Sequence, residues 1–82
     1  MSYIYVLQSP DGKDIYIGFS NDLKRRMSEH EGGLHPGWRL VYYEAYQSES
    51  DARRRERRLK DHGNAIRQLK QRIKDSWDDH SS

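Results

Sequence analysis

Hydrophobic and polar residues alternate along the first twenty positions in the manner of a β-hairpin. Two runs of β-branched and aromatic residues, 3–9 and 14–20, flank the turn-forming sequence SPDGK. Paired positions in an antiparallel hairpin have a constant sum, so a loop at residues 9–12 places Tyr5 opposite Tyr16. The sequence therefore predicts two neighbouring phenols on one face of the hairpin.

The two faces of this hairpin differ in character because successive side chains of a strand point to opposite sides. The hydrophobic core face carries Ile4, Val6, Ile15, Ile17 and Phe19. The other face carries Tyr3, Tyr5, Leu7, Tyr16 and Gly18. A cross-strand aromatic pair would be a sufficient structural reason for the two tyrosines. Gly18, opposite Tyr3 in this register, leaves a gap where the backbone of a ligand could approach.

A short helix and a third strand follow the hairpin. Residues 21–31 predict a helix of about ten residues, with Ser20 or Asn21 as its N-cap and the pair of glycines at 32–33 as its end. Residues 39–46, with the sequence RLVYYEAY, predict the third strand.

Two further helices complete the pattern. Ser48, with Asp51 three residues on, resembles a capping box in which Asp replaces Glu, and a helix should run from there to about His62. A glycine then breaks the pattern, and Asn64 can cap a last helix that runs to about Trp77.

The order ββαβαα predicts an α+β fold, a small three-stranded antiparallel sheet flanked by helices. We expect one domain over residues 1–77 and a frayed tail at 78–82. With 82 residues and 33% hydrophobic positions, the chain can build one modest core.

Charged groups interrupt the hydrophobic stripe of the first helix. That stripe consists of Leu23, Arg26, Met27 and His30, spaced i, i+3, i+4, i+7. A lone charge at the edge of a packed face is costly unless it is paired. The structural explanation is an arginine whose stem packs while its guanidinium reaches solvent. Arg26 therefore has either a structural or a functional role.

A carboxylate occupies the corresponding place in the second helix. Glu56 is the only acid in the sequence ARRRERRLK and shares a face with Ala52 and Leu59. An internal salt bridge to Arg26 or to a neighbouring arginine would be its structural explanation.

Composition narrows the functional classes. There are no cysteines, which excludes a disulfide framework, a Cys-based zinc site and a thiol nucleophile. No histidine pair has zinc-ligand spacing on one element, and carboxylate partners are not clustered, so we expect no zinc. No apolar run approaches the roughly 20 residues that span a bilayer, and the N-terminus lacks signal-peptide features. We expect a cytoplasmic protein that does not interact with membranes.

Positive charge is concentrated near the C-terminus. Residues 53–74 carry ten Lys and Arg residues and two acids, a net charge of +8, although the whole chain carries only +2. Such a segment is typical of a protein that binds a polyanion, nucleic acid first, although a solvated helix face is the alternative. The candidate nucleic-acid contacts are Arg25, Arg54, Arg58, Arg67 and Lys70.

The unusual positions form a chemically complete set for phosphodiester hydrolysis. They are Tyr5, Tyr16, Arg26, His30 and Glu56. Hydrolysis needs a proton acceptor for water, a cation for the charge that develops on phosphorus, and a metal held by a carboxylate. We expect these five side chains to line one concavity.

The motifs in these segments resemble those of the GIY-YIG nuclease superfamily, in particular its small stand-alone bacterial members. The matching elements are YIY at 3–5, YIG at 16–18, NDLKRRMSEH, and a lone glutamate in a basic helix. By this resemblance Tyr5 and Tyr16 are the motif tyrosines, and one of them activates the attacking water. Arg26 stabilises developing charge, and His30 occupies a position that family members fill with His or Tyr.

The resemblance further implies that Glu56 holds one divalent ion, Mg²⁺ or Mn²⁺, which keeps most of its waters. Two positions depart from the family pattern. The first motif begins with Tyr3 in place of Gly, and Gln68 stands where many members carry Asn. Asn64 lies near that position but is assigned above to a helix cap.

The leading hypothesis is a metal-dependent DNA endonuclease that selects branched, flap or single-stranded structures over sequence. The alternative is a nucleic-acid-binding module of the same fold with weak or no catalysis, which the basic segment and several aromatic residues would also suit. An interaction domain without nucleic acid is the third class. The sequence does not indicate an oligomeric state.

Overall fold

Three antiparallel strands form a sheet in the order β2-β1-β3. They are β1 (Ser2–Gln8), β2 (Ile15–Ser20) and β3 (Arg39–Tyr46). This computed structural model describes residues 1–78. Of the expected tail at 78–82, only the backbone of the first residue lies within the described part of the chain. The predicted α+β class and three-stranded antiparallel sheet are confirmed.

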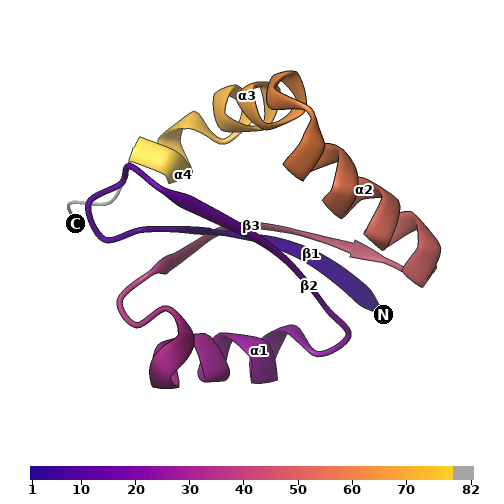
Figure 1. The fold of residues 1–82 in the computed structure, drawn as a ribbon, viewed down its shortest axis with the longest axis horizontal. Helices are drawn as coiled ribbons and strands as arrows, with labels where there is room; N and C mark the ends of the chain where they lie inside the picture. The colour runs from indigo at the N-terminus through magenta and orange to yellow at the C-terminus, as the bar shows by residue number, and fades with distance from the viewer. Residues whose placement is uncertain (79–82) are drawn as a thin grey trace.

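Helices lie on both sides of the sheet. Figure 1 shows α1 on one side and α2, α3 and α4 on the other. The bounds are α1 (Leu23–Glu29), a π-helical turn η1 (His30–Leu34), α2 (Glu49–Asp61), α3 (Gly63–Arg72) and α4 (Lys74–Asp78). The predicted order is confirmed, except that the last helix is divided into α3 and α4.

The hydrophobic core lies between the sheet and the helices α2 and α3. Its buried members are Ile4, Val6, Ile17, Ala52, Leu59 and Leu69. Their burial confirms the predicted core face of the hairpin and supplies the main stabilising free energy of the fold. The opposite face of the sheet, which carries the tyrosines, is left to pack against α1.

The register of the hairpin differs from the predicted one by two residues. Tyr5 pairs with Gly18 and Leu7 pairs with Tyr16, so the predicted pairing of Tyr5 with Tyr16 is wrong. The loop is longer than expected because Ser9 N–H donates to the carbonyl of Asp14 at 3.0 Å. A shift of two keeps every side chain on its predicted face.

Gly18 lies beneath the ring of Tyr5, its cross-strand partner. A Cβ atom at this position would lie 2.3 Å from Cζ and 2.4 Å from the hydroxyl oxygen of Tyr5. The proposed gap opposite Tyr3 is therefore wrong, since Tyr3 pairs with Ser20 and the space above Gly18 is filled by a phenol. Glycine is needed here for close packing of an aromatic ring.

The N-cap of α1 also differs from the prediction. Asp22 is the N-cap, and its carboxylate accepts a hydrogen bond from Arg25 N–H at 3.1 Å. Ser20 is instead bonded to the backbone of Asp22, and Asn21 accepts a hydrogen bond from the Ser2 hydroxyl. Gly33 has a non-helical backbone, with φ 161° and ψ −25°, so the helical conformation is interrupted at the predicted pair of glycines.

The junction between α2 and α3 confirms one predicted cap and contradicts the other. The Ser48 hydroxyl accepts a hydrogen bond from Asp51 N–H, as the capping-box pattern predicted. Asn64 lies inside the first turn of α3 and is not its N-cap; that position is held by His62, which makes no side-chain cap bond.

Two polar side chains of the sheet attach α4. Gln8, fully buried, donates from Nε2 to the carbonyl of Trp77 at 2.9 Å. Arg39 donates to the carbonyl of Ser76 at 2.6 Å and to the side chain of Gln8 at 2.8 Å. These bonds hold the last described turn of the chain against the loop end of β1.

A buried carboxylate that the sequence did not single out joins β3 to α2. Glu44 accepts hydrogen bonds from the hydroxyls of Tyr42 and Tyr46 and from Nε of Arg55 at 3.1 Å. Burial alone would raise the pKa of Glu44, but these three hydrogen bonds together lower it. The carboxylate therefore stays ionised in the folded protein at neutral pH.

We expect Glu44→Gln to lower the free energy of unfolding at pH 7 by about 1.5–3 kcal/mol, the usual range for hydrogen bonds to a charged group. Because the folded pKa is lowered, this stabilisation is present above the unfolded value of about 4.3 and is lost as pH falls through the folded pKa. Thermal melts of both proteins between pH 7 and pH 2.5 test this. The two melting temperatures should converge in acid; a difference that stayed constant would contradict the assignment.

Candidate active site

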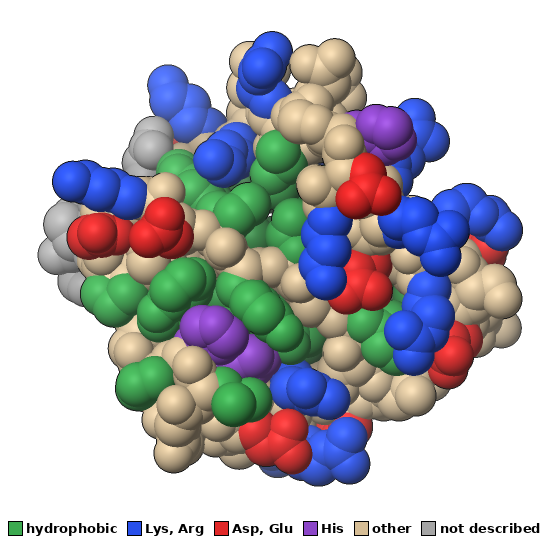
Figure 2. Space-filling view, viewed as in Figure 1, with side chains coloured by type: hydrophobic (Ala, Val, Ile, Leu, Met, Phe, Trp, Pro, Cys, Tyr) green, Lys and Arg blue, Asp and Glu red, His purple; other side chains and the backbone are tan. Residues whose placement is uncertain are grey.

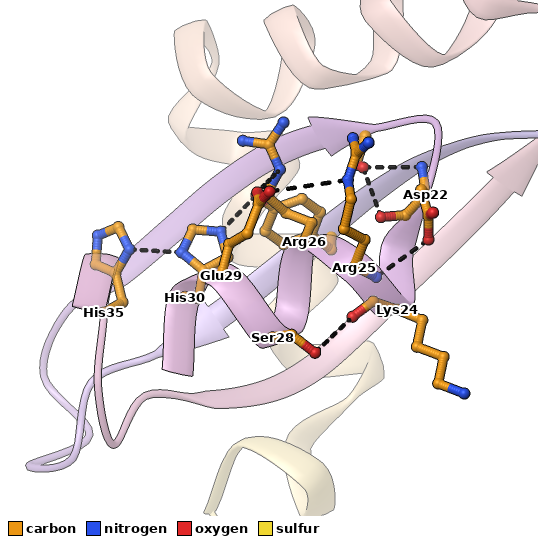
Figure 3. Close-up of polar contacts among 10 residues, drawn as sticks. Asp22, Lys24, Arg25, Arg26, Ser28, Glu29, His30 and His35 are labelled. Carbon is orange, nitrogen blue, oxygen red and sulfur yellow. Dashed lines mark hydrogen bonds and ion pairs between the residues drawn. The ribbon is translucent and has the colours of Figure 1, made fainter. Parts of the chain in front are cut away.

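A chain of hydrogen bonds connects a buried tyrosine to two histidines. The hydroxyl of Tyr5 lies 2.7 Å from Nε2 of His30, and Nδ1 of His30 lies 2.8 Å from Nδ1 of His35. Tyr5 is 0% exposed and His30 is 3% exposed. Figure 3 shows the two imidazole rings side by side, beyond the end of α1.

The π-helical turn brings these two histidines together. In η1 the N–H of His35 donates to the carbonyl of His30 at 2.8 Å, an i to i+5 bond that places the two residues on the same side of the chain. π-Helical turns of this kind occur frequently at functional sites. The second histidine was not predicted, since a spacing of five residues has no meaning on an ordinary helix.

Tyr16 and Trp38 complete an aromatic cluster around His35. The ring of Tyr16 lies 4.5 Å from His35, 5.2 Å from His30 and 6.1 Å from Tyr5, measured between centroids. The ring of Trp38 lies 4.9 Å from that of His35, also measured between centroids. Tyr16 is only half-buried. Of the two motif phenols, Tyr16 is therefore the one that a ligand can reach without a rearrangement.

Burial controls protonation within this cluster. It raises the pKa of the Tyr5 hydroxyl, and the neighbouring Tyr16 raises it further, while Arg26 acts in the opposite direction. Burial also lowers the pKa of His30, assisted by His35 and Arg26. Tyr5 is therefore a neutral phenol and His30 a neutral imidazole at neutral pH.

Arg26 lies at the edge of this cluster, as its position in the stripe predicted. Its Nε lies 3.4 Å from a carboxylate oxygen of Glu29, and its side chain is 33% exposed. That Nε is buried and has no hydrogen-bond partner among residues 1–78. Figure 3 shows Arg25 and Arg26 extending from α1 on the same side. The guanidinium of Arg26 is close enough to lower the pKa values of both Tyr5 and His30.

Glu56 lies on α2 and pairs with a lysine one turn later. Its Oε2 is 3.1 Å from Nζ of Lys60, and its side chain is 18% exposed. The expected alternative, an internal salt bridge to Arg26 or a neighbouring arginine, is wrong, because Arg26 pairs with Glu29. The carboxylate lines a shallow depression of about 240 Å³ together with Arg53, Arg57, Lys60 and Asp61.

Two of the predicted site residues, Tyr16 and Glu56, line two adjoining depressions. Tyr16 lines a separate depression of about 370 Å³ with Lys60, and Glu56 does not line it. The two depressions share Lys60. Glu56 nonetheless raises the pKa of Tyr5 through its charge.

Lys60 was not among the predicted site residues, although it lines both the depression at Glu56 and the one at Tyr16. The signal that could have found it is the i to i+4 spacing from Glu56, which places both side chains on one face of a helix.

Basic side chains line a larger groove between α2 and α3, of about 570 Å³. Its lining residues are Arg54, Arg55, Arg57, Arg58, Asp61, His62, Asn64, Ala65 and Gln68. It shares Arg57 and Asp61 with the depression at Glu56. Figure 2 shows Lys and Arg side chains gathered over the α2 side of the face in view.

The predicted nucleic-acid contacts are distributed around this groove and beyond it. Arg54 lines the groove but lies 3.3 Å from the carboxylate of Asp51, while Arg58 makes no ion pair within residues 1–78. Arg67 is exposed on α3, and the ammonium of Lys70 lies 4.7 Å from the centroid of the Trp77 ring. Arg25, on α1, lies 3.8 Å from Glu29.

Clusters of metal ligands and membrane-spanning helices are not found in the described part of the chain. No three His, Asp or Glu side chains within residues 1–78 gather closely enough to hold a metal ion by themselves. None of the described helices is long and apolar enough to cross a bilayer.

Comparison with known proteins identifies relatives of this chain. The model of the GIY-YIG catalytic domain matches residues 1–74. A UPF0213 protein of Streptococcus agalactiae is 36% identical over 67% of this chain and 69% of its own length. A UPF0213 protein of Clostridium perfringens is 30% identical over 73% of this chain and 71% of its own length. A UPF0213 protein of Halobacterium salinarum is 34% identical over 73% of this chain and 86% of its own length. No solved structure gives a significant match.

Proposed function

Because the chain belongs to the GIY-YIG family of nuclease-type domains, we propose that it is a divalent-metal-dependent endonuclease that hydrolyses DNA phosphodiester bonds. The observation that carries the proposal is the arrangement around Lys60. This residue joins a depression that holds a partly buried carboxylate, Glu56, to one that holds an accessible phenol, Tyr16. A phosphodiester and its attacking water need such groups next to each other.

The donor set at Glu56 fits Mg²⁺ or Mn²⁺ held by a single carboxylate. Oε2 of Glu56 faces Lys60, whereas Oε1 makes no hydrogen bond within residues 1–78. Mg²⁺ usually keeps several waters and binds through one or two carboxylates plus substrate phosphate oxygens, so one carboxylate suffices. When bound, the ion would supply Lewis-acid stabilisation of the charge on the phosphate.

The residues of this chain supply the remaining functions. Tyr16, the accessible phenol, orients the attacking water and, in its phenolate form, accepts the proton of that water. Tyr5 and His30, buried behind it, hold that phenol in place through ring contacts at 6.1 and 5.2 Å. Arg26, whose Nε lacks a hydrogen-bond partner among the described residues, is placed to stabilise the charge that develops on the phosphate.

The basic groove suits the backbone of a DNA strand that leaves the cleavage site. It adjoins the depression at Glu56 through Arg57, and it also holds the amides of Asn64 and Gln68. Arg and Lys contacts to phosphates position a nucleic acid without reading its sequence. We therefore propose selection by DNA structure, such as branches, flaps or single strands.

A cleavage assay tests the proposal. Purified protein is incubated with end-labelled single-stranded, duplex, flap and branched DNA in Mg²⁺, Mn²⁺ or EDTA. We expect cleavage with either metal, none in EDTA, and a preference among structures that does not change with sequence. Tight binding without cleavage would instead support the alternative, a nucleic-acid-binding module, which the complete burial of Tyr5 favours.

The salt dependence of DNA binding tests the basic groove. The logarithm of the binding constant should fall with the logarithm of salt concentration by about 0.7–0.9 per phosphate neutralised. We expect Arg58→Ala to reduce the magnitude of this slope by about 0.7–0.9, the contribution of one phosphate contact. The substitution should weaken binding to all sequences alike. Arg54→Ala, in the same groove, should have a smaller effect, because Asp51 already compensates its charge. Equal effects of the two substitutions would contradict this assignment, and an affinity independent of salt would indicate a partner other than nucleic acid.

A further inference from the structure

The proposed function leaves His35 without a role, although its imidazole closes the hydrogen-bond chain behind the two tyrosines. The ring is half-buried and lies between Tyr16 at 4.5 Å and Trp38 at 4.9 Å. Its Nδ1 faces Nδ1 of His30 at 2.8 Å. Two Nδ1 atoms at this distance can form a hydrogen bond only if one of them carries a proton and the other does not.

This requirement leaves the neutral chain with two arrangements of its protons. In the first, Tyr5 donates to Nε2 of His30, and Nδ1–H of His30 donates to His35. In the second, Nδ1–H of His35 donates to His30, and Nε2–H of His30 donates to the oxygen of Tyr5. Both arrangements satisfy the distances of 2.7 and 2.8 Å. They differ in whether the buried phenol gives or receives a hydrogen bond.

We propose that His35 is a positioning residue that sets the direction of this chain, and that its protonation selects the second arrangement. An imidazolium carries a proton on both nitrogens, so His35 must then donate to His30. His30 keeps one proton, which moves from Nδ1 to Nε2, and Tyr5 keeps its own. The change therefore takes up one proton from solvent, on His35 alone.

The consequence for the site rests on the proposed nuclease function. When Tyr5 receives a hydrogen bond from His30, its own proton is free to point toward the neighbouring Tyr16. A donor aimed at Tyr16 stabilises its phenolate, the form of this side chain that can take a proton from the attacking water and become neutral. The groups that face the two imidazoles are Tyr5 from β1, Tyr16 from β2, and Arg26 and Glu29 from α1. The charges of Arg26 and Glu29 act on the pKa of His30 in opposite directions.

Nitrogen NMR of the histidine side chains tests the chain direction without any cleavage. In ¹⁵N-labelled protein, two-bond spectra report which ring nitrogen of each histidine carries a proton. As His35 titrates, we expect His30 to change from a mixture of tautomers, or from the Nδ1–H form, to the Nε2–H form, with the same midpoint. In His35→Phe, which keeps a ring between Tyr16 and Trp38, that change should disappear. A His30 tautomer that stays constant while His35 titrates would overturn the proposal.

Cleavage kinetics test the consequence. In His35→Phe, we expect kcat to fall by roughly 10-fold or more and to lose one ionisation from its pH profile, with KM for DNA unchanged. Free imidazole should partly restore the rate of His35→Ala. If His35→Phe cleaves at the original rate with the original pH profile, His35 only packs and its proposed effect on catalysis is overturned. If the unsubstituted protein cleaves nothing, the nuclease proposal fails, and the NMR result alone decides the chain direction.

Discussion

Glu56→Gln should abolish cleavage, by at least roughly 10³-fold, in a protein that still folds and still binds DNA. The substitution keeps the shape of the side chain but removes the charge that a divalent ion requires. The only interaction it disrupts among the described residues is the pair with Lys60, an i to i+4 pair on the helix surface. Pairs of this kind contribute about 0.3–0.5 kcal/mol, so the melting temperature should change little.

Glu49→Gln is the matched control for this experiment. Glu49 lies on the same helix and pairs with Arg53 four residues later at 3.2 Å, but it does not line the depression at Glu56. We expect this variant to cleave DNA at the original rate. Three measurements on each variant are needed: single-turnover cleavage, DNA affinity and thermal melting. A folded Glu56→Gln protein with full activity would show that the metal site lies elsewhere, and an unfolded one would show that Glu56 is structural.

Gly18→Ala should reduce both stability and activity, although it adds a single methyl group. The new Cβ would lie 2.3 Å from Cζ of Tyr5 and 2.9 Å from Cε1 of Tyr16, closer than side chains can approach. Tyr5 is fully buried, so its ring can move only by disturbing the core and by breaking its 2.7 Å bond to His30. Overpacking of this kind costs about 1–3 kcal/mol. For a chain of this size we expect the melting temperature to fall by roughly 5–20 °C.

Gly32→Ala provides the comparison. A Cβ at Gly32 would have no atom within 4 Å, so the loss of backbone freedom in the unfolded chain should leave stability unchanged or slightly raised. Circular dichroism and cleavage rates of the two variants separate the effects. If Gly18→Ala were as stable and active as the original protein, the ring of Tyr5 would not be held against β2 in solution.

The period of the hydrophobic pattern was sufficient to predict the elements and the faces of the sheet. Ile4 and Ile17 lie in the core, as the alternation of the hairpin predicted. The register was not predictable, because it depends on hydrogen bonds of Ser9 to Asp14 that lengthen the loop. Since a shift of two residues preserves the faces, the error changed the partners of Tyr5 and Tyr16 without moving either to the wrong side.

The residues of the candidate site were easier to predict from the sequence than their arrangement in space. Arg26 and His30 were found because they interrupt a helical stripe. His30 is hydrogen-bonded to Tyr5, and the charge of Arg26 lowers the pKa of Tyr5. His35 was missed because its contact with His30 depends on a π-helical turn, which no helical periodicity indicates. That Glu56 and Tyr16 line two adjoining depressions depends on how α2 packs on the sheet, which is a tertiary property.

The bonds of Gln8 and Arg39 to α4 show that the fold uses residues beyond the end of the family match. The family match ends at residue 74, yet the carbonyls that satisfy these two side chains belong to Ser76 and Trp77. A fragment cut at the end of the match would contain every proposed catalytic group. It would also leave the buried amide of Gln8, at the end of the central strand, without its acceptor, at a cost of about 1–3 kcal/mol. The family match therefore includes all the proposed catalytic groups but omits part of the chain that supports the fold around them.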